Sequence, residues 1–304
     1  MNQAVSMQTG FFPRLRRFLG KPWPAKICAA GQFARRVLPT LPIPARLPSG
    51  LWYVAWQNDL GNQFLTGAFE EFEYAFVARY LKEGMVVLDI GANEGYYTVL
   101  ASKCIGPRGR VVGFEPSPRE RRRLKINLWI NRCSNVRVEE TALSSAEGQF
   151  DLHVVEGGET GCNSLRPPDI DGKTQTVQVA VTTLDQFLRR NPIDRVDFIK
   201  MDIEGAELTA LQGAGDLLRT FPRPVLLIEI FEIRTRPWGY SAREIVNLIC
   251  EAGYLLYRVI ANGDLAAMDP TLDGLDANFI AVPRERVSEI SSFLPAQETK
   301  YVYH

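Results

Sequence analysis

The chain has 304 residues, 46% of them hydrophobic, and its 35 basic and 35 acidic residues balance to a formal net charge of zero. This length accommodates one large domain with an extension, and no run of residues is apolar for long enough to span a bilayer. The five cysteines show no metal-ligand spacing and only two histidines are present, which argues against a histidine-based zinc site and favours free thiols in a cytoplasmic protein.

The first 50 residues form a basic, Pro-containing N-terminal extension. They hold eight Lys or Arg residues and no acid, so the rest of the chain is mildly acidic. We expect a poorly ordered arm whose Pro-rich part, residues 37–50, is an extended linker. Because Phe11, Phe12 and Phe18 intermingle with arginines, contact of this arm with a membrane surface or a protein partner stays open.

Residues 51–83 form the next segment. Phe69, Phe76 and Tyr80 recur at helical spacing within residues 67–82, which predicts an amphipathic helix packed on a catalytic domain. We place that domain at residues 84–285 and expect residues 286–304 to be a C-terminal tail.

Strands and helices alternate from Met85 onward. The predicted strands are residues 85–90, 110–115, 136–140, 196–202, 225–230, 254–260 and 278–282, with a hairpin between residues 150–155 and 176–181. The predicted helices cover residues 95–104, 118–131, 206–218 and 242–252, and a short one starts near Thr183. This pattern is typical of an α/β fold with a mostly parallel, Rossmann-like sheet and helices on both faces, whose ligand lies beyond the carboxyl ends of the strands.

The most informative segment is Val86–Thr98, which reads VVLDIGANEGYYT. A buried strand, a glycine-bearing loop and a helix start follow one another, as in a nucleotide-binding crossover unit. Asn93 stands where a dinucleotide fingerprint needs its second glycine for close approach of a pyrophosphate. The loop therefore favours a ligand without phosphate, such as S-adenosylmethionine, whose sulfonium and amino groups favour nearby carboxylates.

Three of the predicted strands end in an acid: Asp89, Glu115 and Asp202. Because the carboxyl ends of parallel strands meet at one edge of a sheet, all three are expected to face one crevice. Glu115 is suited to accept hydrogen bonds from ribose hydroxyls, and its charge disfavours the ribose phosphate of NADP. Capping of the helix that follows is the alternative explanation for Glu115.

Two further segments point to the same crevice. The small and apolar residues of TALSS, at residues 141–145, fit beside an adenine ring, although a plain turn explains them equally well. The segment FIKMDIEGAE, at residues 198–207, delivers Lys200, Asp202 and Glu204 with alternating side chains. Stabilisation of a helix start is the alternative explanation for the acids after Asp202.

Taken together, these segments resemble the FkbM family of S-adenosylmethionine-dependent methyltransferases. The matching pieces stand in the family's order between about residues 70 and 231: VVLDIGANEGYYT, VVGFEPSP, NLWINRCSNVRVEETALS, VTTLDQF, DRVDFIKMDIEGAE and PVLLIEI. The resemblance implies a seven-stranded methyltransferase sheet whose last strand is antiparallel. It also implies an O-methyltransferase that acts on a hydroxyl of a sugar, a glycan or a polyketide-like small molecule.

The resemblance also implies which residues form the site. The cofactor-binding residues are Asp89, Gly91, Asn93, Glu94, Gly95, Thr98 and Glu115, with Ala142 and Leu143 beside the adenine. Asp202 and Glu204 lie in the signature near the methyl group and the acceptor, and are the candidate catalytic residues.

A hydroxyl acceptor needs a base that takes its proton during the transfer. Asp202 is the preferred candidate because a strand end fixes it deep in the crevice; Glu204 is the second, and His153 is a lesser one. A metal is not expected, because only Asp202 and Glu204 lie close in the sequence and a divalent cation takes more oxygen ligands. For the acceptor itself, Arg166 and Trp238 are among the candidate contacts, together with Glu159, Asn163, Ser164 and Tyr240.

Two other classes of protein remain alternatives. An NAD-dependent sugar-nucleotide oxidoreductase or epimerase would share the sheet, and a non-catalytic Rossmann module would bind a partner only. Asn93 argues against the first class, and the presence of all three strand-end acids argues against the second. A nucleic acid is not expected as a substrate, since the body of the chain is acidic.

Overall fold

The computed structural model describes residues 42–47, 49–66, 69–157, 161–169, 172–269 and 275–295. The basic arm up to residue 41, Glu159 and residues 296–304 of the expected tail lie outside these ranges. The chain divides into two compact units, Met1–Phe69 and Glu70–His304, which are described separately below. Within the described ranges, none of the helices combines the length and the apolar character needed to cross a bilayer.

The described residues of the first unit form a two-stranded antiparallel sheet and one helix. β1 (Ile43–Arg46) pairs with β2 (Trp52–Ala55), and α3 (Asp59–Thr66) follows. β1 lies in the stretch for which the sequence predicts an extended linker. The backbone is extended there, but it is paired in a sheet.

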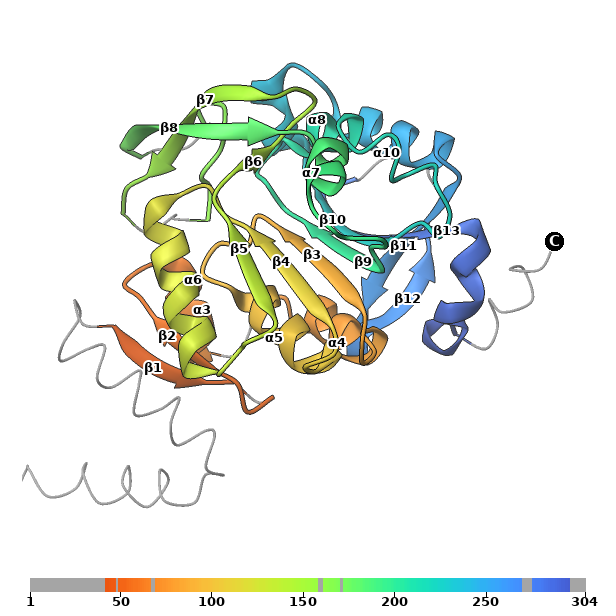
Figure 1. Cartoon of the computed structure of the whole chain (residues 1–304), viewed down its shortest axis with the longest axis horizontal. Helices are drawn as coiled ribbons and strands as arrows, with labels where there is room; N and C mark the ends of the chain where they lie inside the picture. Colours follow the sequence, from red (N-terminus) through yellow and green to blue (C-terminus); the bar gives the residue numbers. More distant parts are fainter. Residues whose placement is uncertain are drawn as a thin grey trace, which may run out of the picture. The chain divides into compact units, whose positions relative to one another are not determined.

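The second unit is built on an eight-stranded sheet (Figure 1). Its strands, in spatial order, are β12 (Asp264–Ala267), β11 (Tyr254–Ile260), β13 (Ala277–Pro283), β10 (Val225–Ile230), β9 (Phe198–Met201), β3 (Val86–Ile90), β4 (Arg110–Phe114) and β5 (Val136–Glu139). β10, β9, β3, β4 and β5 are parallel to one another, whereas β13 is antiparallel to both of its neighbours. The predicted fold class is confirmed; the sheet has one strand more than the seven expected, because β12 adds a short antiparallel edge.

The strand order reverses between β3 and β9. From β3 the chain proceeds outward to β4 and β5, and it then returns to the other side of β3 as β9. In open α/β sheets such a reversal leaves a crevice beyond the carboxyl ends of the two strands, because the connections leave in opposite directions. The loops that follow Ile90 and Met201 therefore stand where a ligand is expected.

Helices cover both faces of this sheet (Figure 1). On one face, α7 (Leu184–Arg190), α8 (Glu207–Gln212) and α10 (Ala242–Glu251) share a continuous apolar core with β3, β4, β9 and β10. On the other face, α5 (Tyr96–Ile105) packs on β3 and β4, and contacts α4 (Glu71–Tyr80) and α6 (Pro118–Ile130). Two short helices, α9 (Glu232–Thr235) and η1 (Arg236–Trp238), follow β10, and η2 (Ala261–Gly263) precedes β12.

The predicted hairpin forms a separate small sheet. β7 (Gly148–Val155) pairs antiparallel with β8 (Thr174–Thr182), and β8 pairs in parallel with β6 (Ala142–Leu143). β6 is the TALSS segment, so this stretch is a short strand and not a plain turn.

α4 packs against a helix from the C-terminal part of the second unit. Phe76 and Tyr80 of α4 are buried, and their rings contact Phe293 at 5.0 and 6.3 Å between centroids. Phe293 belongs to η3 (Arg284–Phe293), a 3₁₀ helix that lies within the stretch expected to be a tail. The predicted helix within residues 67–82 therefore packs on the sheet domain together with the beginning of that stretch.

Candidate active site

The loop after β3 makes an unusually close approach to the end of β9. Gly91 has φ +83°, and a Cβ built on it would lie 1.8 Å from the carbonyl oxygen of Asp202. The Gly91 and Ala92 N–H groups both donate to the carbonyl oxygen of Phe114, at 3.1 and 2.9 Å. A side chain at position 91 has no room, so the glycine is required for the loop to lie between the ends of β4 and β9.

The same loop also positions Glu115. The Asn93 N–H donates to Oε2 of Glu115 at 2.8 Å, and the Ser117 N–H donates to Oε1 at 2.8 Å. Burial raises the pKa of Glu115 to about 8, with a further increase from the carboxylate of Glu120, while the two backbone N–H groups act in the opposite direction. Each carboxylate oxygen keeps a second lone pair, so the group is held rigidly and can still accept hydrogen bonds from a ligand.

Asp89, unlike Glu115 and Asp202, does not line the pocket at this edge of the sheet. It is only 1% exposed and accepts a hydrogen bond from the Thr98 hydroxyl. The expectation that all three strand-end acids face one crevice therefore holds for Glu115 and Asp202 and is wrong for Asp89, whose side chain points into the space under α5. Asp89 and Thr98 support the loop from behind.

Glu94 and Gly95 are also located behind the loop. Glu94 is fully buried and its Oε1 lies 2.7 Å from Nη1 of Arg123 on α6. A Cβ on Gly95 would lie 2.4 Å from Cδ1 of Leu124, so the start of α5 packs directly against α6. Neither residue lines the pocket described next.

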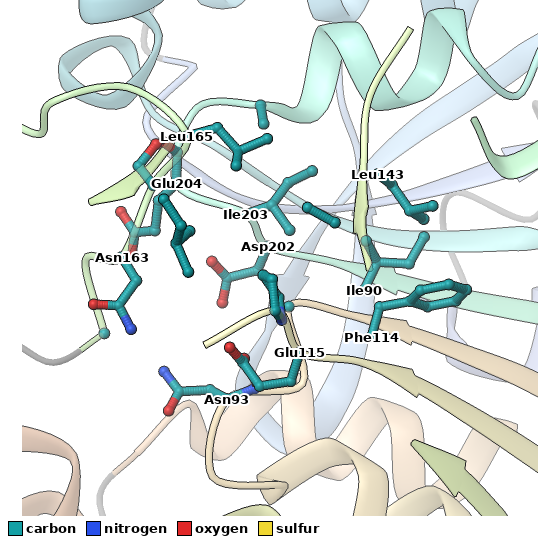
Figure 2. Close-up of a pocket in the computed structure, with 17 residues that line it drawn as sticks. Ile90, Asn93, Phe114, Glu115, Leu143, Asn163, Leu165, Asp202, Ile203 and Glu204 are labelled. Carbon is teal, nitrogen blue, oxygen red and sulfur yellow. Dashed lines mark hydrogen bonds between the residues drawn. The ribbon is translucent and has the colours of Figure 1, made fainter. Parts of the chain in front are cut away.

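A pocket of about 620 Å³, counting its opening to solvent, lies over the carboxyl ends of the strands (Figure 2). Seven of the predicted site residues line it: Gly91, Asn93, Glu115, Ala142, Leu143, Asp202 and Glu204. Its apolar walls, which sequence reasoning did not identify, come from Ile90, Phe114, Leu152, Leu165 and Ile203. Asn163 and Ser164, predicted as acceptor contacts, line the same pocket.

The pocket has the polarity that S-adenosylmethionine requires. Glu115, which is held at both carboxyl oxygens, lines it on one side, and the small apolar residues Ala142 and Leu143 line another part of its wall. Oδ1 of Asn93 is buried and has no hydrogen-bond partner among the described residues, so it awaits a donor from a ligand. The residues present therefore fit this cofactor.

Asp202 is held by a buried lysine. Nζ of Lys200 lies 2.9 Å from Oδ2 of Asp202 and 5.4 Å from the centroid of the Tyr97 ring. Burial alone would lower the pKa of Lys200, but the carboxylates of Asp202, Asp89 and Glu70 raise it above its usual value. Lys200 is therefore a buried cation that holds the Asp202 side chain in place through their ion pair.

Glu204 lies at the centre of a second set of charges. Its Oε2 is 2.9 Å from Nε of Arg234, and burial, with help from Asp202, raises the pKa of Glu204 to about 8 although Arg234 opposes this rise. Carboxylate oxygens of Asp202, Glu204 and Glu229 lie within 4.8 Å of one another. Glu229, on β10, was not a candidate from the sequence.

A second, smaller pocket adjoins the first one and shares Ser164 and Glu204 with it. Arg166, Arg234 and Trp238 line this second pocket, and Cζ of Arg166 lies 5.7 Å from the centroid of the Trp238 ring. Trp238 Nε1 is buried without a hydrogen-bond partner among the described residues. Tyr240 does not line the pocket; its hydroxyl donates to the carbonyl oxygen of Gly205.

Comparison with known proteins identifies the family. The model of the methyltransferase FkbM domain matches residues 89–256. The 2-O-methyltransferase NoeI of Sinorhizobium fredii is 27% identical over 152 residues, which are 45% of this chain and 60% of that protein. Methyltransferase 1 of Beauveria bassiana is 27% identical over 146 residues, or 43% of this chain and 58% of that protein.

Other similarities are more partial. The AMB antimetabolite synthetase AmbE of Pseudomonas aeruginosa is 28% identical over 203 residues, which are 56% of this chain but 9% of that protein. The chain thus spans 60% or less of the length of these three relatives. Among solved structures, fibrillarin of Aeropyrum pernix has a TM-score of 0.40 at 18% identity and covers 79% of this chain and 93% of its own.

The family match decides between the classes of protein left open by the sequence. It spans the glycine loop, both strand-end acids of the pocket and the segment that carries Asp202 and Glu204, so the NAD-linked alternative is set aside. Because the match covers more than half of the chain, this protein belongs to the FkbM methyltransferase family and uses S-adenosylmethionine as its cofactor.

Proposed function

We propose that this protein transfers a methyl group from S-adenosylmethionine to a hydroxyl oxygen of a sugar, a glycan or a polyketide-like small molecule. The observation that carries this proposal is the position of Glu204, which lines both the cofactor pocket and the smaller pocket beside it. A carboxylate at this junction can contact an acceptor in the smaller pocket at the point where the two pockets meet. The relative NoeI is described as a 2-O-methyltransferase, which supports an oxygen acceptor.

The cofactor supplies a methyl group on a positively charged sulfur, which makes the methyl carbon electrophilic. Glu115 would hold the ribose, Ala142 and Leu143 would contact the adenine, and Gly91 and Asn93 would contact the remainder through backbone and amide groups. These residues act by placement, and correct alignment of two reacting atoms accounts for roughly 7–11 kcal/mol of a transfer barrier.

The structure changes the preference between the two candidate bases. Oδ2 of Asp202 is already engaged by Nζ of Lys200 at 2.9 Å, and Asp202 lines the cofactor pocket but not the smaller pocket beside it. Glu204 has a pKa raised to about 8, so its carboxylate accepts a proton more readily. We therefore assign to Glu204 the role of accepting the proton from the acceptor hydroxyl. Asp202 is assigned the role of fixing Lys200 and the glycine loop after β3.

The smaller pocket supports a polyhydroxylated acceptor. Trp238 offers a flat aromatic surface for the apolar face of a sugar ring, and its unpartnered Nε1–H together with the guanidinium of Arg166 offers hydrogen-bond donors for hydroxyl oxygens. A polyketide-like acceptor with several hydroxyls could form hydrogen bonds with the same donors.

The test is a transfer assay with S-adenosylmethionine carrying a labelled methyl group. The purified protein is incubated with a panel of free sugars, glycans and polyhydroxylated polyketides, and the position of the new methyl group is read by NMR. The expected result is an O-methyl ether in one class, lost in Glu204→Gln and retained in the control Glu147→Gln, an exposed acid paired with Arg190 outside both pockets. A product methylated on nitrogen or carbon would overturn the proposal.

A further inference from the structure

The carboxylates of Asp202, Glu204 and Glu229 form a cluster with too few cations. Asp202 is paired with Lys200 and Glu204 with Arg234, each at 2.9 Å. Within the described ranges of the chain, the Glu229 carboxylate has no ion pair and accepts no hydrogen bond, although one of its oxygens lies within 4.8 Å of an oxygen of each of the other two acids. If all three acids were ionised, the cluster would hold three negative charges against the two cations Lys200 and Arg234.

The surroundings of Glu229 increase this excess. Four acids act on it electrostatically, from β9 and its loop, from α8 and from the start of α4: Asp202, Glu204, Glu207 and Glu70. Arg234 of α9, which is already paired with Glu204, is a cation that acts on Glu229 in the opposite direction. Asn278, its neighbour across the β10–β13 pair, is neutral. Burial, followed by Asp202 and Glu204, raises the pKa of Glu229 well above the usual range of a glutamate. A like-charged, partly desolvated group of this kind keeps a proton until a cation arrives nearby.

S-adenosylmethionine and the product left after methyl transfer differ by one charge, which is located on the sulfur. The donor carries a sulfonium, whereas S-adenosylhomocysteine has a neutral thioether; their adenine, ribose and amino-acid parts are the same. Asp202 and Glu204 line the cofactor pocket, and Glu229 lies directly behind them, within 4.8 Å of both, without lining the pocket itself.

We propose that Glu229, together with Glu204, forms the counter-charge that selects the cationic donor over the neutral product. In the free protein the pair shares a proton, and it releases that proton when the donor binds. Replacement of the donor by the product lets the pair take a proton up again, which weakens retention of the product relative to the donor. This inference rests on the cofactor and is independent of the proposed acceptor.

The experiment is calorimetric titration of the full-length protein with S-adenosylmethionine and, separately, with S-adenosylhomocysteine. Each titration is done at pH 7 in two buffers of different ionisation enthalpy, because the difference in heat gives the number of protons released. The donor is expected to release more protons than the product. Between pH 6.5 and 8.5 the preference for the donor should rise by roughly tenfold, as linkage to a single proton requires.

Three variants locate the effect. Glu229→Gln fixes the neutral state, so the extra proton release and the pH-dependent preference should be lost, while binding of S-adenosylhomocysteine is kept and shows that the pocket is folded. Glu229→Asp keeps the charge and should restore part of both signals. Glu147→Gln, the exposed control, should behave as the unchanged protein.

Two results would overturn the inference. The first is equal proton release for donor and product, or unchanged release in Glu229→Gln. The second is tight binding of Mg²⁺ or Mn²⁺ alone that Glu229→Gln abolishes, because the three carboxylates would then be a metal site. Failure of both ligands to bind would instead contradict the use of this cofactor, and failure to find an acceptor would bear only on the proposed function.

Discussion

Replacing Gly91 by alanine tests whether the close approach of the glycine loop to β9 builds the cofactor pocket. Gly84 is a matched control, because the two glycines have nearly the same backbone angle, φ +83° and +84°. Their surroundings differ: a Cβ on Gly91 would lie 1.8 Å from the carbonyl oxygen of Asp202, whereas one on Gly84 would meet nothing within 4 Å. The pair therefore separates the cost of the backbone angle from the cost of the contact.

The magnitudes follow from these two terms. A left-handed backbone at a non-glycine residue costs about 1–2 kcal/mol, which applies to both variants. Overpacking adds about 1–3 kcal/mol, and it applies only at Gly91, where the loop must move by more than an ångström to make room. We expect Gly84→Ala to lose about 1–2 kcal/mol of unfolding free energy and Gly91→Ala about 2–5 kcal/mol.

Urea unfolding measures the free energies, and calorimetric titration with S-adenosylhomocysteine measures the pocket. Gly91 fixes the loop that carries Asn93, and the backbone of Asn93 in turn holds Glu115. Gly91→Ala should therefore bind S-adenosylhomocysteine at least roughly tenfold more weakly than Gly84→Ala. Equal stability and equal binding of the two variants would refute the argument that the approach of loop and strand shapes the site.

Three other predictions concern single groups of the pocket. Glu115→Gln should weaken binding of S-adenosylhomocysteine by roughly ten- to hundredfold, since its amide cannot accept at both Asn93 and Ser117; unchanged affinity in titration would exclude the ribose role. Asp202→Asn should lower the free energy of unfolding in urea by about 1.5–3 kcal/mol, because Lys200 loses a charged acceptor. The same variant should also have a lower turnover, and full turnover would show that Asp202 is dispensable. The cofactor-free protein should lose stability as the pH rises from about 5 to 8. Burial raises the pKa of Glu70 and Glu207 to about 7 and that of Glu115 and Glu204 to about 8. In this pH range the native state therefore binds protons that the unfolded chain has already released, and deprotonation favours unfolding. Urea midpoints at pH 5, 6.5 and 8 measure this, and a midpoint that increases over this range would contradict the buried acids.

Much of the fold could be predicted because the sequence alternates clearly between apolar strands and amphipathic helices. Each of the seven predicted sheet strands is present, and the hairpin has its expected antiparallel pairing. β12 escaped prediction because its four residues, DLAA, carry no periodic pattern. η3 escaped because it is polar overall, although Val287, Ile290 and Phe293 are buried at a spacing of three, which is the period of a 3₁₀ helix.

The site was predictable where the chain itself fixes the geometry. Glu115 and Asp202 line the pocket because each directly follows a strand and is held by neighbouring backbone. Asp89 belongs to the same pattern, but its direction depends on the pleat of β3 and on Thr98 one turn into α5. A sequence position at a strand end therefore does not decide which way the side chain points.

Glu229 could not be identified as a site residue from the sequence at all. In the apolar strand VLLIEI a single acid near the end resembles an ordinary solvent-facing residue. Only the pairing of β10 with β9, in which Ile228 lies opposite Met201, brings Glu229 beside Asp202. This adjacency is a property of the sheet order and is invisible from the local sequence.

The two kinds of acid in this pocket can be separated by experiment because they meet different parts of the cofactor. Glu115 would contact the ribose, which donor and product share, so its protonation changes the affinity of both ligands equally. Under the proposal above, Glu204 and Glu229 respond to the charge on the cofactor's sulfur, so they affect the difference between the two affinities. The pH dependence of S-adenosylhomocysteine binding thus reports on Glu115, and the ratio of the two dissociation constants reports on the cluster. If Glu115→Gln changed that ratio while Glu229→Gln left it intact, the roles of the two ends of the pocket would have to be exchanged.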